Sequence, residues 1–86
     1  MYTIIDIESN GAPFRKESII EIAIYKYDGH EIVDQFISLV NPESEITPFV
    51  QKLTKISPKM VKTAPHFHEI ARRVVEITEH TALVGH

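Results

Sequence analysis

The stretch IIEIAIYKYDGHEIVDQFISLVNP, residues 19–42, decides the fold of this chain. Two runs rich in β-branched and aromatic residues flank Asp28-Gly29, a pair typical of a tight hairpin turn. We therefore predict one strand within residues 16–27 and an antiparallel partner over residues 31–40. Asn41-Pro42 ends the second strand, because proline has no amide hydrogen to give to the ladder.

An apolar run that ends in two carboxylates precedes this hairpin. YTIIDIESNG, residues 2–11, predicts a first strand over residues 2–8, closed by the turn-forming pair Asn10-Gly11. Side chains two apart on a strand point the same way, so Asp6 and Glu8 share one face at the C-terminal end of this strand. The three strands together predict an antiparallel meander.

The second half of the chain changes to helical spacing. Pro48 and Pro58 punctuate short helical or irregular pieces, and from Pro65 the apolar residues recur at helical intervals. We predict a long helix with Pro65 in its first turn, ending near His80. Its buried face is expected to hold Phe67, Ile70, Ala71, Val74 and Ile77 or Thr78.

Two further features complete the predicted topology. Glu69 and Arg73 are spaced one helical turn apart, which predicts an ion pair on the solvent side of the long helix. TALV, residues 81–84, predicts a short fourth strand after the helix, so the sheet continues beyond the meander. The predicted fold class is α/β, with a mixed sheet.

Composition restricts the class of protein. The 86 residues suffice for one small domain. No apolar run approaches the ~20 residues that span a bilayer, and no leader segment is visible, so no membrane partner is expected. Because the chain has no cysteine, disulfides and thiolate metal sites are excluded, and we expect a cytoplasmic protein. A net charge of −3 argues against a broad phosphate-neutralising surface, but not against an enzyme that meets phosphate through bound metal ions.

The two carboxylates of the first strand need a physical explanation. Burying two like charges side by side is unfavourable unless something neutralises them. Carboxylate oxygens are ligands that Mg²⁺ and Mn²⁺ prefer, which makes Asp6 and Glu8 candidate metal ligands. The alternative is that both lie on an edge strand facing water, since a D-x-E pattern is common by chance. Their place at the end of the most apolar strand, before a glycine turn, favours the metal site.

Six segments in order along the chain resemble one enzyme family. IIDIESNG resembles the first motif of the DEDD-type 3′→5′ exonucleases, the family of the proofreading epsilon subunit of bacterial DNA polymerase III. The other segments are IIEIAIYKYDG, FISLVNP, LTKIS, APHFHEI and LVGH. The resemblance implies a ribonuclease H-like fold, of which residues 1–86 are the N-terminal part, ending before the Asp of the second motif. It also implies hydrolysis of phosphodiester bonds from a 3′ end with two Mg²⁺ or Mn²⁺ ions.

The resemblance implies roles for individual residues as well. Asp6 is expected to bridge both metal ions, and Glu8 to bind the ion that activates water. Glu21 either supports these ligands from behind or is a partly exposed structural carboxylate. Lys55 stands where the family has Gly, so a different turn is expected beside the substrate residues. The residues expected to meet the terminal nucleotide are Ser9, Asn10, Gly11 and Leu53.

Half of the family's active site has no counterpart in this chain. The family uses four carboxylates and a His or Tyr as general base, whereas only Asp6 and Glu8 match here. His86 matches the structural His of the second motif and not the base. We therefore expect the 86-residue chain to be inactive by itself, although the resemblance makes it part of an enzyme.

Expected partners follow from the resemblance and from the open sheet. DNA 3′ ends are the expected substrate, in replication proofreading or repair, with RNA ends as an alternative. Polymerase subunits or a further domain after residue 86 are expected neighbours, and the uncovered edge at residues 81–84 predicts self-association. A non-catalytic nucleic-acid-binding or protein-interaction module is the alternative from another class of protein.

Two other sets of side chains have ordinary interpretations. Five histidines could suggest zinc, but His66 and His68 are not expected to face the same way, and no Cys or H-E-x-x-H pattern supports them. Four lysines fall at roughly helical spacing but are divided by Pro58, which favours an ordinary charged surface over a phosphate contact. These are Lys52, Lys55, Lys59 and Lys62.

Overall fold

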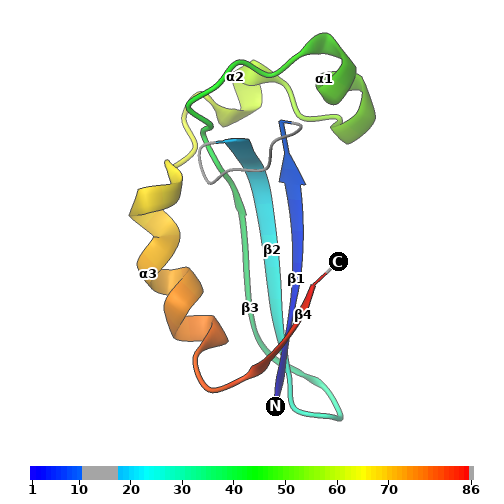
Figure 1. Ribbon diagram of the computed structural model, residues 1–86, viewed down its shortest axis with the longest axis vertical. Helices are drawn as coiled ribbons and strands as arrows, with labels where there is room; N and C mark the ends of the chain where they lie inside the picture. The colour runs from blue at the N-terminus through cyan, green and yellow to red at the C-terminus, as the bar shows by residue number, and fades with distance from the viewer. Residues whose placement is uncertain (11–17, 86) are drawn as a thin grey trace.

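The computed structural model describes residues 1–10 and 18–85, which fold into four strands and three helices. The elements are β1 (Tyr2–Ser9), β2 (Ile19–Tyr27), β3 (Ile32–Leu39), α1 (Pro48–Thr54), α2 (Pro58–Val61), α3 (Phe67–Thr78) and β4 (Ala82–Gly85). The sheet has the order β3-β2-β1-β4 (Figure 1). β1 is antiparallel to β2 and parallel to β4, while β2 is antiparallel to β3. The predicted mixed sheet and the order of its elements are confirmed.

The connection between β2 and β3 confirms the predicted hairpin, although it is longer than the turn typical of Asp-Gly. Residues 28–31 form the loop. The Asp28 carboxylate accepts hydrogen bonds from the backbone N–H groups of His30 and Glu31, at 2.8 and 2.9 Å. Gly29 has a φ of 104°, a conformation that side chains oppose. The aspartate side chain therefore organises the wider turn.

Helix α3 covers one face of the sheet and forms the main core with it. Ile70 and Ile77 of the helix are buried, and Phe67 and Val74 pack beside them. These residues belong to the predicted apolar stripe, which is thereby confirmed. Their partners on β2 include Ile24, which is fully buried. Side-chain direction repeats every 3.6 residues in the helix and every 2 residues in the strands, so each element has one apolar face. These two faces pack against each other.

A second core cluster lies at the end of the sheet, beneath α1 and α2. Its buried residues are Ile20, Ile46, Val50, Ile56 and Val61. Both proline-punctuated pieces are short helices, each with its proline in the first turn. Thr47 caps α1 by accepting a hydrogen bond from the Val50 N–H, at 3.3 Å. Ser57 caps α2 in the same way through the Met60 N–H, at 3.4 Å.

The predicted ion pair on α3 is wrong. Glu69 instead accepts a hydrogen bond from the His66 N–H at 2.8 Å, which closes the N-terminus of the helix. Arg73 instead donates to both carboxylate oxygens of Asp34 on β3, at 3.1 and 3.0 Å. The helix begins at Phe67, so Pro65 precedes its first turn and does not belong to it. A capping site for Glu69 and a carboxylate on the sheet that accepts twice from one nitrogen of Arg73 replace the pair along the helix.

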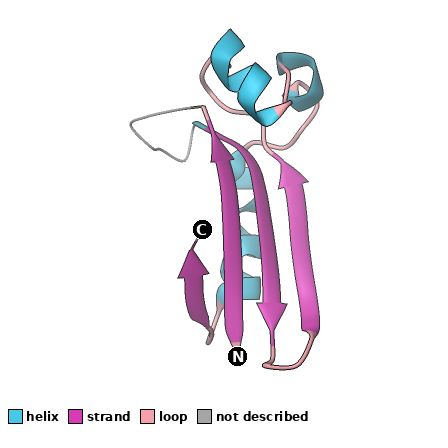
Figure 2. Ribbon diagram, turned by 90° about the vertical axis from the view of Figure 1, so that its right-hand side faces the viewer, coloured by secondary structure: helices cyan, strands magenta, loops and turns pink. Residues whose placement is uncertain are grey.

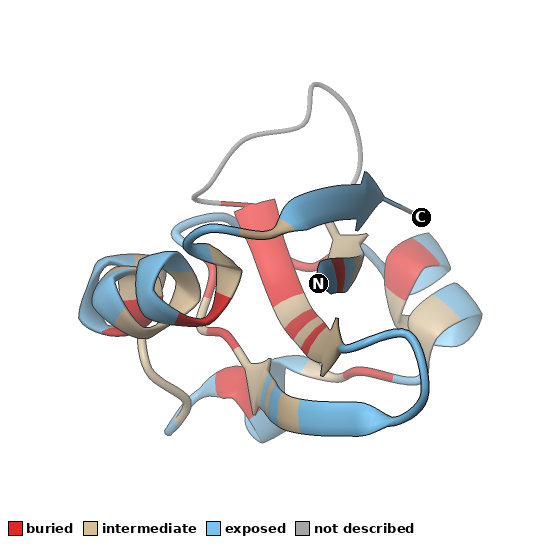
Figure 3. Ribbon diagram, turned by 90° about the horizontal axis from the view of Figure 1, so that it is seen from below, coloured by how far each residue is buried: buried red, intermediate tan, exposed pale blue. Residues whose placement is uncertain are grey.

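The other face of the sheet carries no helix among the described residues (Figure 2). Tyr2 and Ile4 of β1 lie on this uncovered face and are exposed. Strand β4, at the edge of the sheet, is exposed along its whole length (Figure 3). Within the described ranges, no helix is long and apolar enough to cross a membrane.

Candidate active site

Asp6 and Glu8 lie at the C-terminal end of β1, on the uncovered face of the sheet. Alternation along the strand decides this, because Ile5 and Ile7 point to the opposite face and pack against the α3 core. Asp6 is exposed, while Glu8 is half-buried. The strand changes register with β2 between Glu8 and Ser9, directly after the second carboxylate. The predicted pair therefore shares one face, with its first carboxylate open to solvent.

Glu21 of β2 brings a third carboxylate to the same face. In the β1–β2 ladder it is the direct partner of Glu8, while Asp6 is opposite Ala23. Like charges directly opposite each other destabilise an antiparallel pair. No hydrogen bond or ion pair from residues 1–10 and 18–85 engages the side chains of Asp6, Glu8 or Glu21. The repulsion between these side chains therefore lacks a compensating donor or cation from the described part of the chain.

The carboxylates at this end of β1 supply only some of the ligands that a metal centre needs. Carboxylate oxygens at residues 6 and 8 are of the type that Mg²⁺ and Mn²⁺ accept. Among the described residues, however, no group of three or more His, Cys, Asp or Glu side chains is arranged to hold a metal ion. The described residues therefore offer two carboxylates at the end of β1 but not a complete set of metal ligands. Glu21 stands beside the pair and does not complete it.

Asn10 follows the carboxylate strand and joins it to the segment before α1. Its side-chain amide donates to the hydroxyl of Ser44, at 3.1 Å, and to the backbone carbonyl of Glu45. Its carbonyl oxygen accepts from the backbone N–H of Thr47, at 3.3 Å. Thr47 is the residue that caps α1. Sequence reasoning missed this role, because no local pattern indicates partners so far along the chain.

The other residues predicted to meet substrate are Ser9, Gly11 and Leu53, of which the structure describes Ser9 and Leu53. Ser9 is half-buried at the change of register and pairs with Ile19 of β2. Gly11 lies outside the described residues. Leu53 lies on α1 and is 70% exposed. Helix α1 stands beyond the C-terminal end of β1, as both Figure 1 and Figure 2 show. The structure thus places Leu53 and the carboxylate pair at the same end of the sheet.

Lys55 keeps a turn of the kind that glycine favours. It follows α1 with a φ of 65°, in the left-handed conformation, and its N–H bonds to the Gln51 carbonyl at 2.9 Å. Lys55 therefore forms a left-handed cap at the end of α1, whereas a different turn from that of the family was expected there from the resemblance. An open groove of about 460 Å³ lies beside it and is lined by Phe49, Lys52, Leu53 and Lys55.

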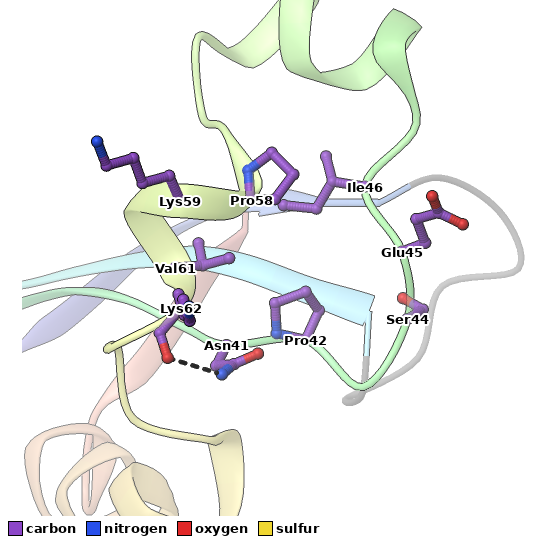
Figure 4. Close-up of a pocket in the computed structure, with 9 residues that line it drawn as sticks. All are labelled: Asn41, Pro42, Ser44, Glu45, Ile46, Pro58, Lys59, Val61 and Lys62. Carbon is purple, nitrogen blue, oxygen red and sulfur yellow. Dashed lines mark hydrogen bonds between the residues drawn. The ribbon is translucent and has the colours of Figure 1, made fainter.

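A larger pocket, of about 630 Å³, lies between α2 and the segment that leads to α1 (Figure 4). Its lining residues are Asn41, Pro42, Ser44, Glu45, Ile46, Pro58, Lys59, Val61 and Lys62. Asn41 closes one side by donating to the Lys62 carbonyl, at 3.4 Å. None of the described residues predicted from sequence to form the site lines this pocket. It touches the site only through Ser44 and Glu45, the partners of Asn10.

The expectation that His66 and His68 face different ways is wrong. Their rings are stacked, with centroids 5.7 Å apart and planes 9° from parallel. His66 has an extended backbone as the N-cap of α3, so the helical spacing used in the expectation does not apply to it. No third ligand joins them in a metal-binding group among the described residues. The stacked pair is therefore part of the helix start.

Comparison with known proteins identifies the family. The RNase T family, described as exonucleases, matches residues 3–86. The chain therefore belongs to this exonuclease family, which confirms the resemblance to DEDD-type exonucleases drawn from its motifs. Membership in this family supports a nuclease, which is a hydrolase, by resemblance.

Named relatives agree with this family. The chain is 38% identical over 85 residues to the PolC-type DNA polymerase III of Caldanaerobacter subterraneus subsp. tengcongensis. It is 31% identical over 85 residues to the 3′-5′ exonuclease DinG of Staphylococcus aureus. Each match covers 99% of this chain, but only 6% and 10% of the respective relative. The chain therefore spans a small part of the length of these relatives.

A solved structure supports the fold. Exonuclease X, in complex with 5′ overhanging duplex DNA, matches with a TM-score of 0.75 and 21% identity. The match covers 99% of this chain and 58% of that structure. The sheet and helices described above therefore have the ribonuclease H-like fold of these exonucleases.

Proposed function

We propose that residues 1–86 are the N-terminal part of a 3′→5′ exonuclease domain of the epsilon type, acting on DNA ends in replication proofreading or repair. The observation that carries this proposal is the shared, solvent-accessible face of Asp6 and Glu8 at the end of β1. Family membership supports the reaction class, and the names of the PolC and DinG relatives support DNA and the 3′ end. We place this activity in the cytoplasm.

In this proposal Asp6 and Glu8 are the metal ligands that the chain contributes. Divalent cations bound there would supply the positive charge that stabilises the attacking and leaving oxygens of a displacement at phosphorus. Asp6 is exposed, so a cation bound to it would be open to a phosphate, whereas Glu8 is half-buried and more restricted in its rotamers. Glu21, opposite Glu8, would hold that side chain away from β2 by repulsion and so direct it toward the open face.

The terminal nucleotide would meet residues on two elements. Ser9 follows the carboxylates directly, and Leu53 offers an exposed apolar side chain at the same end of the sheet. A leucine packed on the face of a base excludes water without selecting a sequence, which suits an exonuclease. Asn10 and Gly11 complete the proposed substrate set. RNA ends remain the alternative substrate, since these residues make no distinction at the sugar.

The catalytic set is incomplete in this proposal. Two carboxylates and a general base would have to come from further along a complete domain, since no group of three or more His, Cys, Asp or Glu side chains among the described residues could hold a metal ion. We therefore propose that the 86-residue chain does not cleave nucleic acid by itself. A further domain or polymerase subunits would be its partners.

The test uses the full-length protein encoded by the gene. A single-stranded DNA labelled at its 5′ end should shorten from its 3′ end when Mg²⁺ or Mn²⁺ is present. Asp6→Asn and Glu8→Gln should each abolish the shortening, while Glu76→Gln, an exposed carboxylate on α3, should leave it unchanged. Retained shortening in either site variant would show that the assignment of the pair is wrong. Binding without cleavage by the wild-type protein would favour the non-catalytic module instead.

A further inference from the structure

Charge is unevenly distributed along this acidic chain. Residues 46–68 contain four of its nine Lys and Arg residues and none of its twelve Asp and Glu residues. This segment includes both short helices, α1 and α2, and the start of α3. A chain of net charge −3 therefore has one region that is locally basic, at the end of the sheet where α1 and α2 lie (Figure 1).

Two large apolar side chains are exposed within this basic region. Phe49 and Leu53 of α1 are 74% and 70% exposed. They are four residues apart, so they lie one above the other on the same face of the helix. Lys52 and Lys55 complete the lining of the groove that these residues form. An aromatic ring and two ammonium groups thus share one open surface.

This combination fits single-stranded nucleic acid better than other anionic partners. Bases stack on aromatic side chains irrespective of sequence, while phosphates pair with nearby lysines. An acidic peptide would satisfy the lysines but would offer no flat surface to Phe49. Duplex DNA would keep its bases stacked within the helix and so also leave the phenyl ring without a partner.

The surface also has a direct connection to the carboxylate strand. Asn10, two residues after Glu8, is hydrogen-bonded to Ser44, Glu45 and Thr47 in the segment that leads into α1. The cap of α1 is therefore attached to the end of β1. A nucleic-acid strand bound along α1 would therefore lie at the same end of the sheet as the carboxylate pair.

We propose that Phe49, Lys52 and Lys55 form a binding surface for single-stranded nucleic acid on α1, next to the terminal-nucleotide position assigned to Leu53. Phe49 stacks on a base upstream of the terminal nucleotide, and the two lysines pair with the adjoining phosphates. The direction in which the nucleic-acid strand runs, with its 3′ end at Leu53, rests on the proposed exonuclease function. Binding of the strand to this surface requires no metal ion.

The experiment measures binding of a fluorescently labelled oligothymidylate to the 86-residue chain by anisotropy, with EDTA present. Phe49→Ala should weaken binding about tenfold, as expected for one base stacked on an aromatic ring. The same substitution should have no effect on an abasic oligonucleotide of equal length. Val75→Ala, which shortens an apolar side chain exposed on α3, should leave both affinities unchanged.

The lysines are tested through the salt dependence of the affinity. Lys52→Ala combined with Lys55→Gly removes two charges and keeps a residue suited to the left-handed conformation at position 55. The slope of log K against log salt should become shallower by about 1.4, because each phosphate neutralised on a single strand contributes about 0.7. Lys59→Ala combined with Lys62→Ala, the same charge change on and after α2, should alter the slope by much less.

Several results would overturn the inference. These are absent binding by the wild-type chain, unchanged affinity in Phe49→Ala, an equal loss on the abasic strand, or an equal slope change in the control lysine pair. Polyglutamate that binds as tightly as the oligonucleotide would assign the surface to an acidic protein instead. Because no metal is present, these results are independent of Asp6 and Glu8. Metal-free binding with no cleavage by the full-length protein would overturn the proposed exonuclease function alone.

Discussion

The Thr47 backbone N–H donates a hydrogen bond to the side-chain oxygen of Asn10, at 3.3 Å, and thereby joins the end of the carboxylate strand to the cap of α1. The same Asn10 side chain also binds Ser44 and the Glu45 carbonyl. Position 10 follows the candidate metal ligands by only a few residues. One amide group thus joins those ligands to the exposed face of α1, in addition to the packing of Val50 against Ile20.

Replacing Asn10 with Ala should loosen the segment that leads to α1. Loss of its side-chain hydrogen bonds should lower the free energy of unfolding by about 1–2 kcal/mol, measured by urea titration. Amide chemical shifts should change in residues 44–54 and remain unchanged in α3. Asn41→Ala, which removes a single 3.4 Å bond to the Lys62 carbonyl, is the matched control. Unchanged shifts in residues 44–54 would show that Asn10 does not position α1.

Glu8→Gln should stabilise the metal-free chain and remove its response to metal. Without a cation, the substitution relieves repulsion from Glu21 and should raise the free energy of unfolding by about 0.5 kcal/mol. With Mn²⁺ present, the wild-type chain should be the more stable of the two, because it gains stability from a bound ion and the variant does not. Glu76→Gln on α3 should respond like the wild type. A variant that Mn²⁺ stabilises as much as the wild type would exclude Glu8 as a ligand.

Acid should weaken the contact between β3 and α3. Hydrogen bonds from Arg73, and then from the Gln35 N–H, hold the pKa of Asp34 below its ordinary value of 3.8. A carboxyl whose pKa is lowered by folding stabilises the fold at neutral pH, and this contribution is lost as pH falls from 3.8 through the lowered value.

The variant Asp34→Asn isolates this contribution. Urea titrations between neutral and acid pH should show a smaller loss of stability in the variant than in the wild type. Backbone hydrogen bonds from Glu31 and His30 also lower the pKa of Asp28, but that residue is present in both proteins and cancels in the difference. Parallel acid profiles for the two proteins would contradict the role given to the Asp34–Arg73 pair.

Lys55→Gly should stabilise the end of α1. The lysine adopts a φ of 65°, which costs an L-residue about 1 kcal/mol relative to glycine. The free energy of unfolding should therefore rise by roughly that amount, as measured by thermal or urea denaturation. Lys55→Ala removes the same charge but retains a Cβ, so it should give no such gain. Equal stabilisation by both substitutions would attribute the effect to charge.

The exposed strand β4 predicts association of the 86-residue chain. Leu83 and Val84 are 62% and 47% exposed at the edge of the sheet, where unpaired backbone groups can bind another strand. Sedimentation should show dimers or larger species whose population rises with concentration. Val84→Lys should shift the chain toward monomer, whereas Val75→Lys on the outer face of α3 should not. A wild-type chain that stays monomeric would contradict this prediction.

Local periodicity was sufficient to predict most elements of the fold. Alternation along residues 2–8 placed Asp6 and Glu8 on one face, and the spacing of Phe67, Ile70 and Ile77 predicted the buried stripe of α3. These predictions succeed because the period of side-chain direction belongs to each element and requires no knowledge of its neighbours. The predicted start of α3 at Pro65 is wrong, because His66 is the N-cap and the helix begins at Phe67.

The sequence by itself determined the strands, the long helix and the pair of carboxylates that share a face. Tertiary structure alone decided that Glu21 is opposite Glu8, that Arg73 binds Asp34 instead of Glu69, and that Asn10 holds the cap of α1. The physical reason is that register and side-chain hydrogen bonds join residues far apart in the chain. These partners are set by how whole elements pack against one another, and a local pattern of residues contains no information on which distant residue will be the partner.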